Sequence, residues 1–342
     1  MNSHSRPIAY FQWLRLFAAL AVVLMHTAGK HWSAISHETA QWLALTFWDS
    51  MVRWPVPVFV MITGALFLPR VTELKTVLTR YIPRMALAFF LWSGVYALYS
   101  LHRGASAEEA VLKFVSGEYH LWYLPFLCGV YLVLPFLQKI VTDEKLAAQL
   151  LVTAMVIGLM LPWLADLTVL LWPRTTDVVR SLENSLHFTF FFDHLSLLLL
   201  GHALHRRELS PVRRRVLYGL GLLSILLTGP ATVWASHRAG SQNSLFFDHA
   251  APTTLLAAAA IFVFAKYHLT RLPKAVDALA RLSFGVYLSH VLILELLAQR
   301  GFHALALGPG WSVPVLALAV FAISALLSAV LGKIPLLGRY LT

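Results

Sequence analysis

The segment Trp13–Thr27 (WLRLFAALAVVLMHT) is largely apolar, yet it contains two residues that can do chemistry, Arg15 and His26. In an α-helix, residues eleven positions apart lie about 20° from each other around the axis and about 16 Å apart along it. A guanidinium group is suited to binding phosphate. An imidazole, with an unperturbed pKa of about 6.5, is suited to taking a proton from a hydroxyl. The spacing therefore predicts one helix face that binds an anion at one end and transfers a proton at the other.

Each of these two residues also has a structural explanation when it is taken alone. Arg15 is near enough to one membrane surface to extend its charge to the headgroups, and His26 fits a position at the opposite interface. Charged groups at the centre of a membrane helix cost about 2.5–3.5 kcal/mol on insertion scales. The presence of both residues on one face favours the functional interpretation.

The composition of the whole chain predicts whether this helix lies in water or in a membrane. Of 342 residues, 58% are hydrophobic and 13% charged, and the mean hydropathy is +0.70, whereas about a quarter of the residues of a soluble domain are charged. A helix needs about 20 apolar residues to cross a bilayer. We predict an all-α, polytopic membrane protein in which residues 1–342 form a single domain, with ten transmembrane helices at 8–29, 47–68, 82–101, 121–140, 147–170, 186–204, 215–235, 250–267, 282–300 and 312–332.

The formal charge of +11 is a topology signal rather than a sign of nucleic-acid binding. Most of the 27 lysines and arginines fall in the loops on the same side as the N-terminus, and basic loops favour the cytoplasm. Both termini are therefore expected in the cytoplasm. The polar start MNSHSRP does not resemble a cleavable signal, so we expect the first span to remain as an anchor. The single cysteine and the lack of CxxC, HExxH and GxxxxGK[ST] patterns predict no metal and no phosphate-binding loop.

The second predicted span adds a carboxylate and a guanidinium group at about the depth of His26. Asp49 and Arg53 are four residues apart with the acid first, which is the favoured order for an ion pair on a helix. We predict that Arg53 contacts the molecule whose hydroxyl His26 deprotonates, which would be the acceptor in a transfer reaction, or an oxyanion that develops there, and that Asp49 orients Arg53 or His26. A simple ion pair at the interface is the alternative.

Four stretches together resemble one known family. Arg15 and His26 match an Arg–x10–His motif, and the other three stretches are VPVFVMITGALFL (56–68), HLWYLPFLCGVYLVLPFL (120–137) and SFGVYLSHVLILELL (283–297). In these motifs the chain resembles the membrane acyltransferase family 3, whose members O-acetylate surface polysaccharides. Within that family it is most similar to the subgroup that O-acetylates enterobacterial common antigen.

The resemblance implies an activity, a donor and a place in the cell. It implies a bacterial inner-membrane enzyme that transfers an acyl group, usually acetyl, from cytoplasmic acyl-CoA to a hydroxyl of a cell-envelope glycan or lipid-linked saccharide. His26 is then expected to act as general base, and Arg15 to hold the donor. The extended arm of coenzyme A is of the same order as the ~16 Å between the two residues.

The acceptor is expected at the outer ends of the fourth and ninth spans. Glu118, His120 and Trp122 begin the fourth span, and His290 lies in the ninth; the family motifs carry His120 and His290. An aromatic belt at the interface also explains Trp122, and hydrogen bonding between helices also explains His290.

The cytoplasmic loop after the second span is the expected binding region for the phosphates of coenzyme A. It contains Arg80 and Arg84 within RYIPR, where family members often have two arginines separated by two residues rather than three. Residues four apart share a helix face, although Pro83 interrupts helical hydrogen bonding. The positive-inside rule explains the same charges without a ligand.

Other functions and other routes fit some of these features. A transporter or flippase of a lipid-linked glycan would also place charges within a ten-helix bundle, but transporters commonly contain inverted repeats and paired broken helices, and here the polar residues are unevenly distributed. A membrane acyltransferase of another fold is argued against by the four motifs. For transfer itself, the residues are compatible with direct transfer, with an acyl intermediate on His26, or with modification of the acceptor before export.

Overall fold

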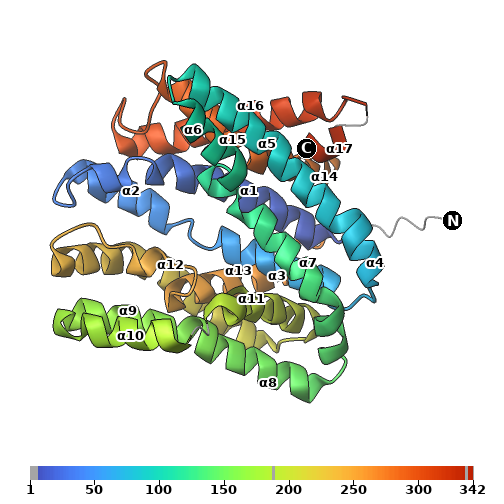
Figure 1. Ribbon diagram of the computed structural model, residues 1–342. Coiled ribbons are helices and arrows are strands. Elements are labelled where there is room, and N and C mark those ends of the chain that lie inside the picture. The colour runs from blue at the N-terminus through green and yellow to red at the C-terminus, as the bar shows by residue number, and fades with distance from the viewer. Residues whose placement is uncertain (1–6, 187–188, 336–337, 342) are drawn as a thin grey trace.

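The computed structural model describes residues 7–186, 189–335 and 338–341, and this part of the chain is helical, without a strand. Most of the helices run roughly along one common axis, which is horizontal in Figure 1. The longer helices are α1 (Ala9–Gly29), α2 (Ala40–Ser50), α3 (Pro55–Phe67), α5 (Ile82–His102), α6 (Ala107–Ser116), α7 (Tyr123–Ile140), α8 (Glu144–Ala154), α9 (Leu161–Leu171), α10 (Thr176–Leu186), α11 (Thr189–Arg206), α12 (Pro211–Ala239), α13 (Pro252–His268), α14 (Lys274–Arg281), α15 (Ser283–Ala298) and α16 (Pro309–Leu331).

Short helical segments connect these helices. They are η1 (Trp32–Ala34), α4 (Leu74–Thr76), η2 (Val77–Tyr81), η3 (Tyr119–Trp122), η4 (Met155–Met160), η5 (Pro173–Thr175), η6 (Leu245–Phe247) and α17 (Gly338–Leu341). Two of them, η2 and η4, are π-helical turns within longer helices.

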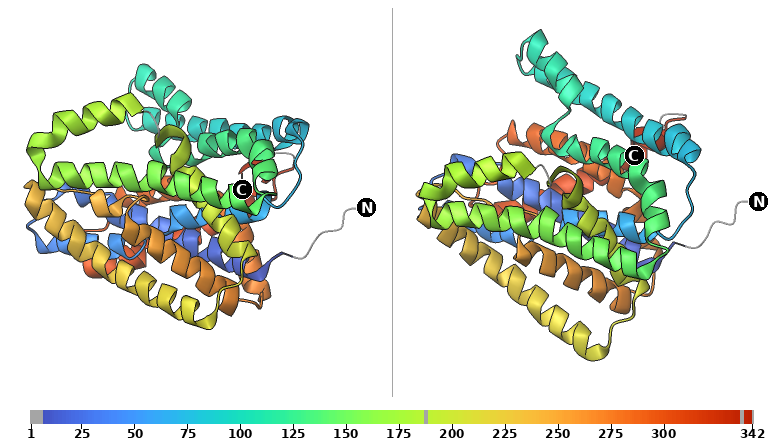
Figure 2. Two further views of the ribbon diagram at one scale, coloured as in Figure 1. Left: turned by 90° about the horizontal axis from the view of Figure 1, so that it is seen from below. Right: turned by 60° about the horizontal axis from the view of Figure 1, so that its bottom comes forward.

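Eight helical segments within the described ranges are long and apolar enough to cross a membrane. The bent pair α14–α15, with 58° between its halves, makes a ninth if it is counted as one span. The remaining predicted span, 186–204, corresponds to α11, which starts beside residues 187–188, outside the described part. The chain is thus an all-α polytopic membrane protein. Its peripheral helices fit that environment: α8, α9 and α12 lie at the surface of the bundle (Figure 2), and apolar side chains such as Leu222 and Leu226 are 60% and 56% exposed.

The second predicted span begins earlier than expected and is broken. It extends from Ala40 to Phe67, and α2 and α3 are separated by Met51–Trp54. Pro55 stands at the start of α3, and a proline lacks the amide hydrogen and disfavours helical backbone in the residue before it. In a membrane, such a break is tolerated where protein covers it. It places Asp49 and Arg53 at the junction of two helices rather than within one.

The first helix is at the centre of the bundle. α1 packs against α2, α3, α13, α14, α15 and α16, and most of its side chains are buried or partly buried. The closest helix pair elsewhere is α3 with α11, where two glycines allow the backbones to meet. A Cβ atom on Gly64 would lie 1.9 Å from the Leu198 carbonyl oxygen, and one on Gly201 would lie 2.1 Å from the Met61 carbonyl oxygen. Small residues permit such approaches between membrane helices.

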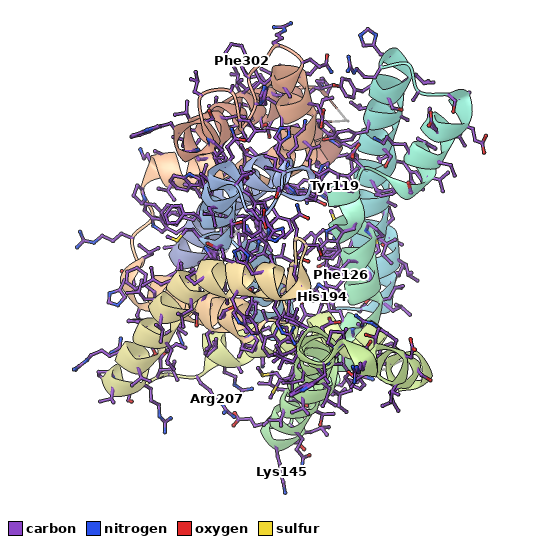
Figure 3. All side chains as sticks on the ribbon, turned by 90° about the vertical axis from the view of Figure 1, so that its left-hand side faces the viewer. Tyr119, Phe126, Lys145, His194, Arg207 and Phe302 are labelled. Atoms are coloured by element: carbon purple, nitrogen blue, oxygen red, sulfur yellow. The ribbon has the colours of Figure 1, made fainter. Side chains whose placement is uncertain are left out.

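The segment α5–α7 forms an arm beside this bundle, visible as the blue-green column on the right of Figure 3. The extensive backbone contacts of α7 are with α5, η2 and η3. Its contacts with the helices of the bundle are made mainly by side chains, such as Phe59 with Tyr123 and Phe67 with Tyr131. We call this junction between the arm and the bundle the seam.

The first helix of the described chain begins, and the last helix ends, on the same side of the bundle. The start of α1 and α17 lie at the same end of the bundle as α4 and α14, on the right of Figure 1. The loops after α1, α5 and α12 lie at the opposite end. The assignment of the first end to the cytoplasm remains a prediction from the distribution of basic residues.

Candidate active site

Three histidines from different parts of the chain meet at the end of the seam that carries the α1–α2 loop. His26 lies in the last turns of α1, His120 in η3 and His290 in α15. Their ring centroids are separated by 5.2 Å for His26 and His290, 5.0 Å for His120 and His290, and 6.4 Å for His26 and His120. The hydroxyl of Tyr119 lies 3.4 Å from His26 Nδ1. Figure 3 shows Tyr119 where the arm meets the bundle.

The tautomer of His290 follows from its contacts. Its Nδ1 lies 2.8 Å from the Tyr287 carbonyl oxygen and 3.1 Å from the Val286 carbonyl oxygen. Since carbonyl oxygens only accept hydrogen bonds, Nδ1 carries the proton. Nε2 is then an acceptor, and it is buried without a hydrogen-bond partner in the part of the chain described. His290 therefore presents a buried, unused proton acceptor within the histidine cluster.

Two tyrosines hold the cluster in place. The Tyr96 hydroxyl donates to the Leu288 carbonyl at 3.0 Å and accepts from the Leu292 amide at 3.1 Å. It therefore contacts the carbonyl and the amide that pair with each other in a regular turn of α15. The Tyr287 hydroxyl donates to the His120 carbonyl at 2.7 Å. These bonds tie α5, η3 and α15 together around His290. Supports of this kind keep reactive groups in fixed geometry.

Arg15 lies further along the seam and lacks a counter-charge. Its Nη1 donates to Gln12 Oε1 at 3.3 Å, and Gln12 in turn donates to Asp277 at 3.0 Å. The groups of α7 that act on the Arg15 charge are the hydroxyls of Tyr131 and Tyr123. Among the residues that the structure describes, no carboxylate forms an ion pair with Arg15, unlike the arginines at 53, 180, 206 and 281. A partly buried cation without a counter-ion is costly in a membrane protein, and an anionic ligand would stabilise it.

Arg15 and His26 thus lie on the same side of α1, and both face the arm. Arg15 is near Tyr131 and Tyr123 of α7, and His26 is near Tyr119. Because α7 runs antiparallel to α1 along the seam, its residues pass from the histidine cluster toward the arginine as their numbers rise. The seam therefore connects an uncompensated cation with a histidine cluster over about three helical turns.

Asp49 and Arg53 form a buried ion pair beside the cluster. The side chain of Asp49 is 1% exposed and that of Arg53 21%. The Arg53 guanidinium lies 3.8 Å from the centre of the Phe247 ring, and its charge acts on both His26 and Asp248. One carboxylate oxygen of Asp49 has no hydrogen-bond partner among the described residues. The pair is placed to influence charge at His26 without contacting it directly.

Two of the residues predicted for the acceptor side lie away from the three rings. Trp122 is 43% exposed and contacts the rings of Phe126 and His194 instead. Figure 3 shows Phe126 and His194 next to each other and apart from Tyr119. Glu118 forms an ion pair of 2.8 Å with Lys113. Of the four residues predicted there, the structure brings His120 and His290 next to His26.

The two arginines predicted to bind coenzyme A are at the opposite end of the arm and are separated. Both side chains are exposed. Arg80 lies in the π-helical turn η2, and Arg84 in the first turn of α5. Arg84 lies 5.8 Å from the ring of Phe284, and its charge acts on Tyr131, as does that of Arg15. Arg84 is thus the one of the two that is near the seam.

Sequence reasoning missed two tyrosines of this site, Tyr96 and Tyr119. Tyr96 lies in the third predicted span and Tyr119 just before His120, and neither was singled out. The sequence carries a weak signal in that a tyrosine hydroxyl buried in an apolar span needs a partner. No cluster of three or more His, Cys, Asp or Glu residues within the described ranges is arranged to hold a metal ion.

These features define a multi-span membrane protein with a cluster of three histidines at a helix junction. A family model described as an acyltransferase domain matches residues 8–332, nearly the whole chain. The chain belongs to this acyltransferase family 3, and it is a membrane acyltransferase rather than a transporter. The comparisons with curated proteins and with solved structures find no match; the narrower resemblance to the subgroup that acts on enterobacterial common antigen therefore has no relative to support it.

Proposed function

We propose that the protein is an O-acyltransferase of the bacterial inner membrane. It transfers an acyl group, acetyl in the simplest case, from cytoplasmic acyl-CoA to a hydroxyl of a cell-envelope glycan or lipid-linked saccharide. The observation that carries the proposal is that the uncompensated cation Arg15 and the histidine cluster at His26 share one face of α1 along the seam.

Arg15 supports the assignment of the donor. A guanidinium group binds phosphate through several hydrogen bonds, and no described carboxylate pairs with this one. The phosphates of coenzyme A carry the charge that is missing there. Arg84, whose charge also reaches Tyr131, is suited to a further phosphate contact at the mouth of the seam, whereas Arg80 is exposed on η2.

His26 supports the assignment of the base. The acceptor hydroxyl gives its proton to His26 while its oxygen forms a bond to the thioester carbonyl carbon. The tetrahedral intermediate then collapses, the carbon–sulfur bond breaks, and the departing thiolate takes the proton from His26. The products are the acyl ester and free coenzyme A. Positioned bases of this kind contribute roughly 10²–10⁴-fold to a rate.

The neighbours of His26 have supporting roles in this scheme. The oxyanion of the intermediate needs a donor or a cation in a dry site. Arg53, fixed by Asp49 and acting electrostatically on His26, supplies positive charge. The Tyr119 hydroxyl, 3.4 Å from His26 Nδ1, is a candidate donor. His120 and His290 complete the wall on which the acceptor hydroxyl approaches.

The test is a transfer assay with the purified full-length protein in nanodiscs. Radiolabelled acetyl-CoA and a cell-envelope glycan extract are supplied to wild type, to His26→Ala and to His31→Ala. His31 is the matched control, because it lies five residues further on and contacts His303 rather than the cluster. Label should enter glycan with wild type and His31→Ala and fall by at least about 100-fold with His26→Ala. Full transfer by His26→Ala would remove the base assignment, and no labelled glycan with wild type would contradict the proposed function.

A further inference from the structure

A polar cavity of about 310 Å³ lies beside the histidine cluster, at the end of the arm that carries the α5–α6 loop. We call it the vestibule. Its walls come from α5, α6 and α15, from the loop after α5 and from Glu118, the residue before η3. The lining residues on which the argument rests are Tyr96, Tyr99, Ser100, Arg103, Glu118 and Glu295. Its volume is at the lower end of the range for small-molecule sites, ~300–1,000 Å³.

Two tyrosines separate the vestibule from the histidine cluster. Tyr96 belongs to both, since it lines the vestibule and its hydroxyl lies 3.5 Å from His120 Nε2. Tyr119 reaches His26 Nδ1 with its hydroxyl, and the charges of Glu118 and Glu295 both act on it. A molecule in the vestibule is therefore one side-chain layer away from the proposed base.

The charges of the vestibule are largely balanced. Glu295 pairs with Lys30 at 2.6 Å, and Glu118 pairs with Lys113 at 2.8 Å. Each pair joins two different elements, so the pairs also close the vestibule on two sides. Arg103 is exposed at the rim. Because both carboxylates already have a cation, a cationic ligand finds no free carboxylate on those walls. Among the described residues, Arg103 is the lining cation without an ion pair, and it is exposed to solvent, where a charge pair contributes little.

The hydrogen-bonding groups of the vestibule suit a molecule with many hydroxyls. Hydroxyl groups both donate and accept, and Ser100 and Tyr99 supply two of them on successive residues of α5. Ser100 Oγ donates to the Ala97 carbonyl at 2.8 Å and keeps its lone pairs for a ligand. The carboxylates of Glu118 and Glu295 add acceptors, and the ammonium group of Lys113 adds donors. The Tyr99 ring adds an apolar face of the kind on which a sugar ring can pack.

The loop at the rim is held rigidly. Gly104 has φ +91°, a conformation that glycine adopts without strain. Ser106 and Glu109 then form a reciprocal capping box that starts α6. Arg103 and Lys113 are thereby presented from fixed backbone on both sides of this turn.

We propose that the vestibule is the acceptor subsite, and that the group it binds is an uncharged sugar residue whose reacting hydroxyl passes Tyr119 to reach His26. This inference rests on the proposed transfer to a glycan and adds the place and the charge class of the acceptor. Neither Tyr99 nor Ser100 has a part in the donor site proposed above.

The experiment fills the vestibule and measures acceptor binding apart from catalysis. Ser100→Trp places a large side chain in the cavity, and Leu98→Trp, on the same helix at a 68% exposed position, is the matched control. The ligands are the neutral and the acidic fractions of cell-envelope oligosaccharides, separated by anion exchange. Binding to full-length protein in nanodiscs is followed by saturation-transfer NMR, and binding of acetyl-CoA is measured in parallel.

We expect the neutral fraction to bind wild type and Leu98→Trp alike, and to lose about tenfold in affinity for Ser100→Trp. Acetyl-CoA should bind all three within about twofold. Unchanged binding of the neutral fraction to Ser100→Trp, or no binding of it to wild type, would overturn the proposal. If Ser100→Trp does not fold, Ala105→Phe fills the same cavity from the loop and the same losses are expected.

A separate variant tests whether the bound sugar is uncharged. Arg103→Ala should change binding of the neutral fraction by less than about twofold. Preferential binding of the acidic fraction that depends on Arg103 would contradict the uncharged class. Two results separate the vestibule proposal from the proposed function. If Ser100→Trp transfers the acyl group as well as wild type does, the acceptor subsite is refuted and the activity is not. If wild type binds the glycan but does not transfer the acyl group, the activity is refuted and the subsite is not.

Discussion

At the scale of single residues, the most sensitive electrostatic element is the pair of Asp49 and Arg53. The carboxylate is almost completely buried and Arg53 lies against an aromatic ring. Removing one partner of a buried pair leaves an uncompensated charge, at a cost of about 3–5 kcal/mol. An exposed pair contributes about 0–1 kcal/mol, because water replaces the partner.

We therefore expect Asp49→Ala to lower the thermal unfolding temperature of the purified protein far more than Asp166→Ala. Asp166 pairs with Arg180, and the two side chains are 44% and 50% exposed. The double change Asp49→Ala with Arg53→Gln should recover part of the loss, since the stranded charge is gone. Equal shifts for Asp49→Ala and Asp166→Ala would show that the first pair is not an isolated buried one.

The residue scale also shows what sequence reasoning can and cannot see. The relation of Arg15 to His26 depends only on the helical repeat, so it was predictable within one segment. The proximity of Arg15 to Tyr131 and of His26 to Tyr119 depends on which helices become neighbours, and apolar spans carry little information about that. For the same reason the role of Tyr96, which joins α5 to α15, had no local signal.

At the scale of elements, α3 and α11 pack closely against each other, and α3 also contacts the arm through Phe59 and Phe67. Gly64 and Gly201 leave no space for a side chain, because the partner backbone occupies the position of a Cβ atom. Overpacking costs about 1–3 kcal/mol where side chains can adjust, and backbone adjusts less easily.

Gly201→Leu is therefore expected to lower the yield of folded protein and its thermal unfolding temperature. Gly219→Leu in α12 is the control, because no atom lies within 4 Å of its Cβ position, and it should leave both unchanged. Fluorescence-detected size exclusion with a temperature ramp measures both quantities. A tolerated leucine at 201 would mean that α3 and α11 are farther apart than described.

The break between α2 and α3 and the bend between α14 and α15 also belong to this scale. Proline marked the first break in the sequence, since Pro55 and Pro57 interrupt helical hydrogen bonds, yet the predicted span began at residue 47 instead of Ala40. The polar loop of 30–46 hid the start of α2, which the Thr39 side chain caps by accepting from the Trp42 amide. The bend after Arg281 has no proline or glycine to announce it.

At the scale of the whole molecule, the amino-acid composition was sufficient to predict the fold class. A mean hydropathy of +0.70 and repeated apolar runs left few alternatives to a helical membrane bundle. The order of packing was not predictable, because lipid-facing and buried apolar faces have similar composition. The position of α1 at the centre, and of α5–α7 as an arm, emerges only from the structure.

The predicted orientation can be tested with single cysteines, because Cys128 is the only natural one. In a Cys128→Ser background, the substitutions are Ser33→Cys in η1 and Ser241→Cys in the loop after α12, both at one end, and Arg70→Cys and Thr270→Cys at the other; all four positions are exposed. A membrane-impermeant maleimide added to intact cells should label the first two alone. Labelling of the second two without permeabilisation would invert the topology and place Arg15 away from cytoplasmic acyl-CoA.

Donor binding is assigned to Arg15 and proton transfer to His26, at the two ends of one face of α1. The most direct test is the affinity of acetyl-CoA for three proteins: wild type, Arg15→Gln and His26→Gln. Equilibrium binding in nanodiscs should weaken by at least about tenfold for Arg15→Gln, a difference of about 1.4 kcal/mol, and by less than about twofold for His26→Gln. Equal weakening by both substitutions, or none by Arg15→Gln, would contradict a donor held by the arginine and activated at the histidine.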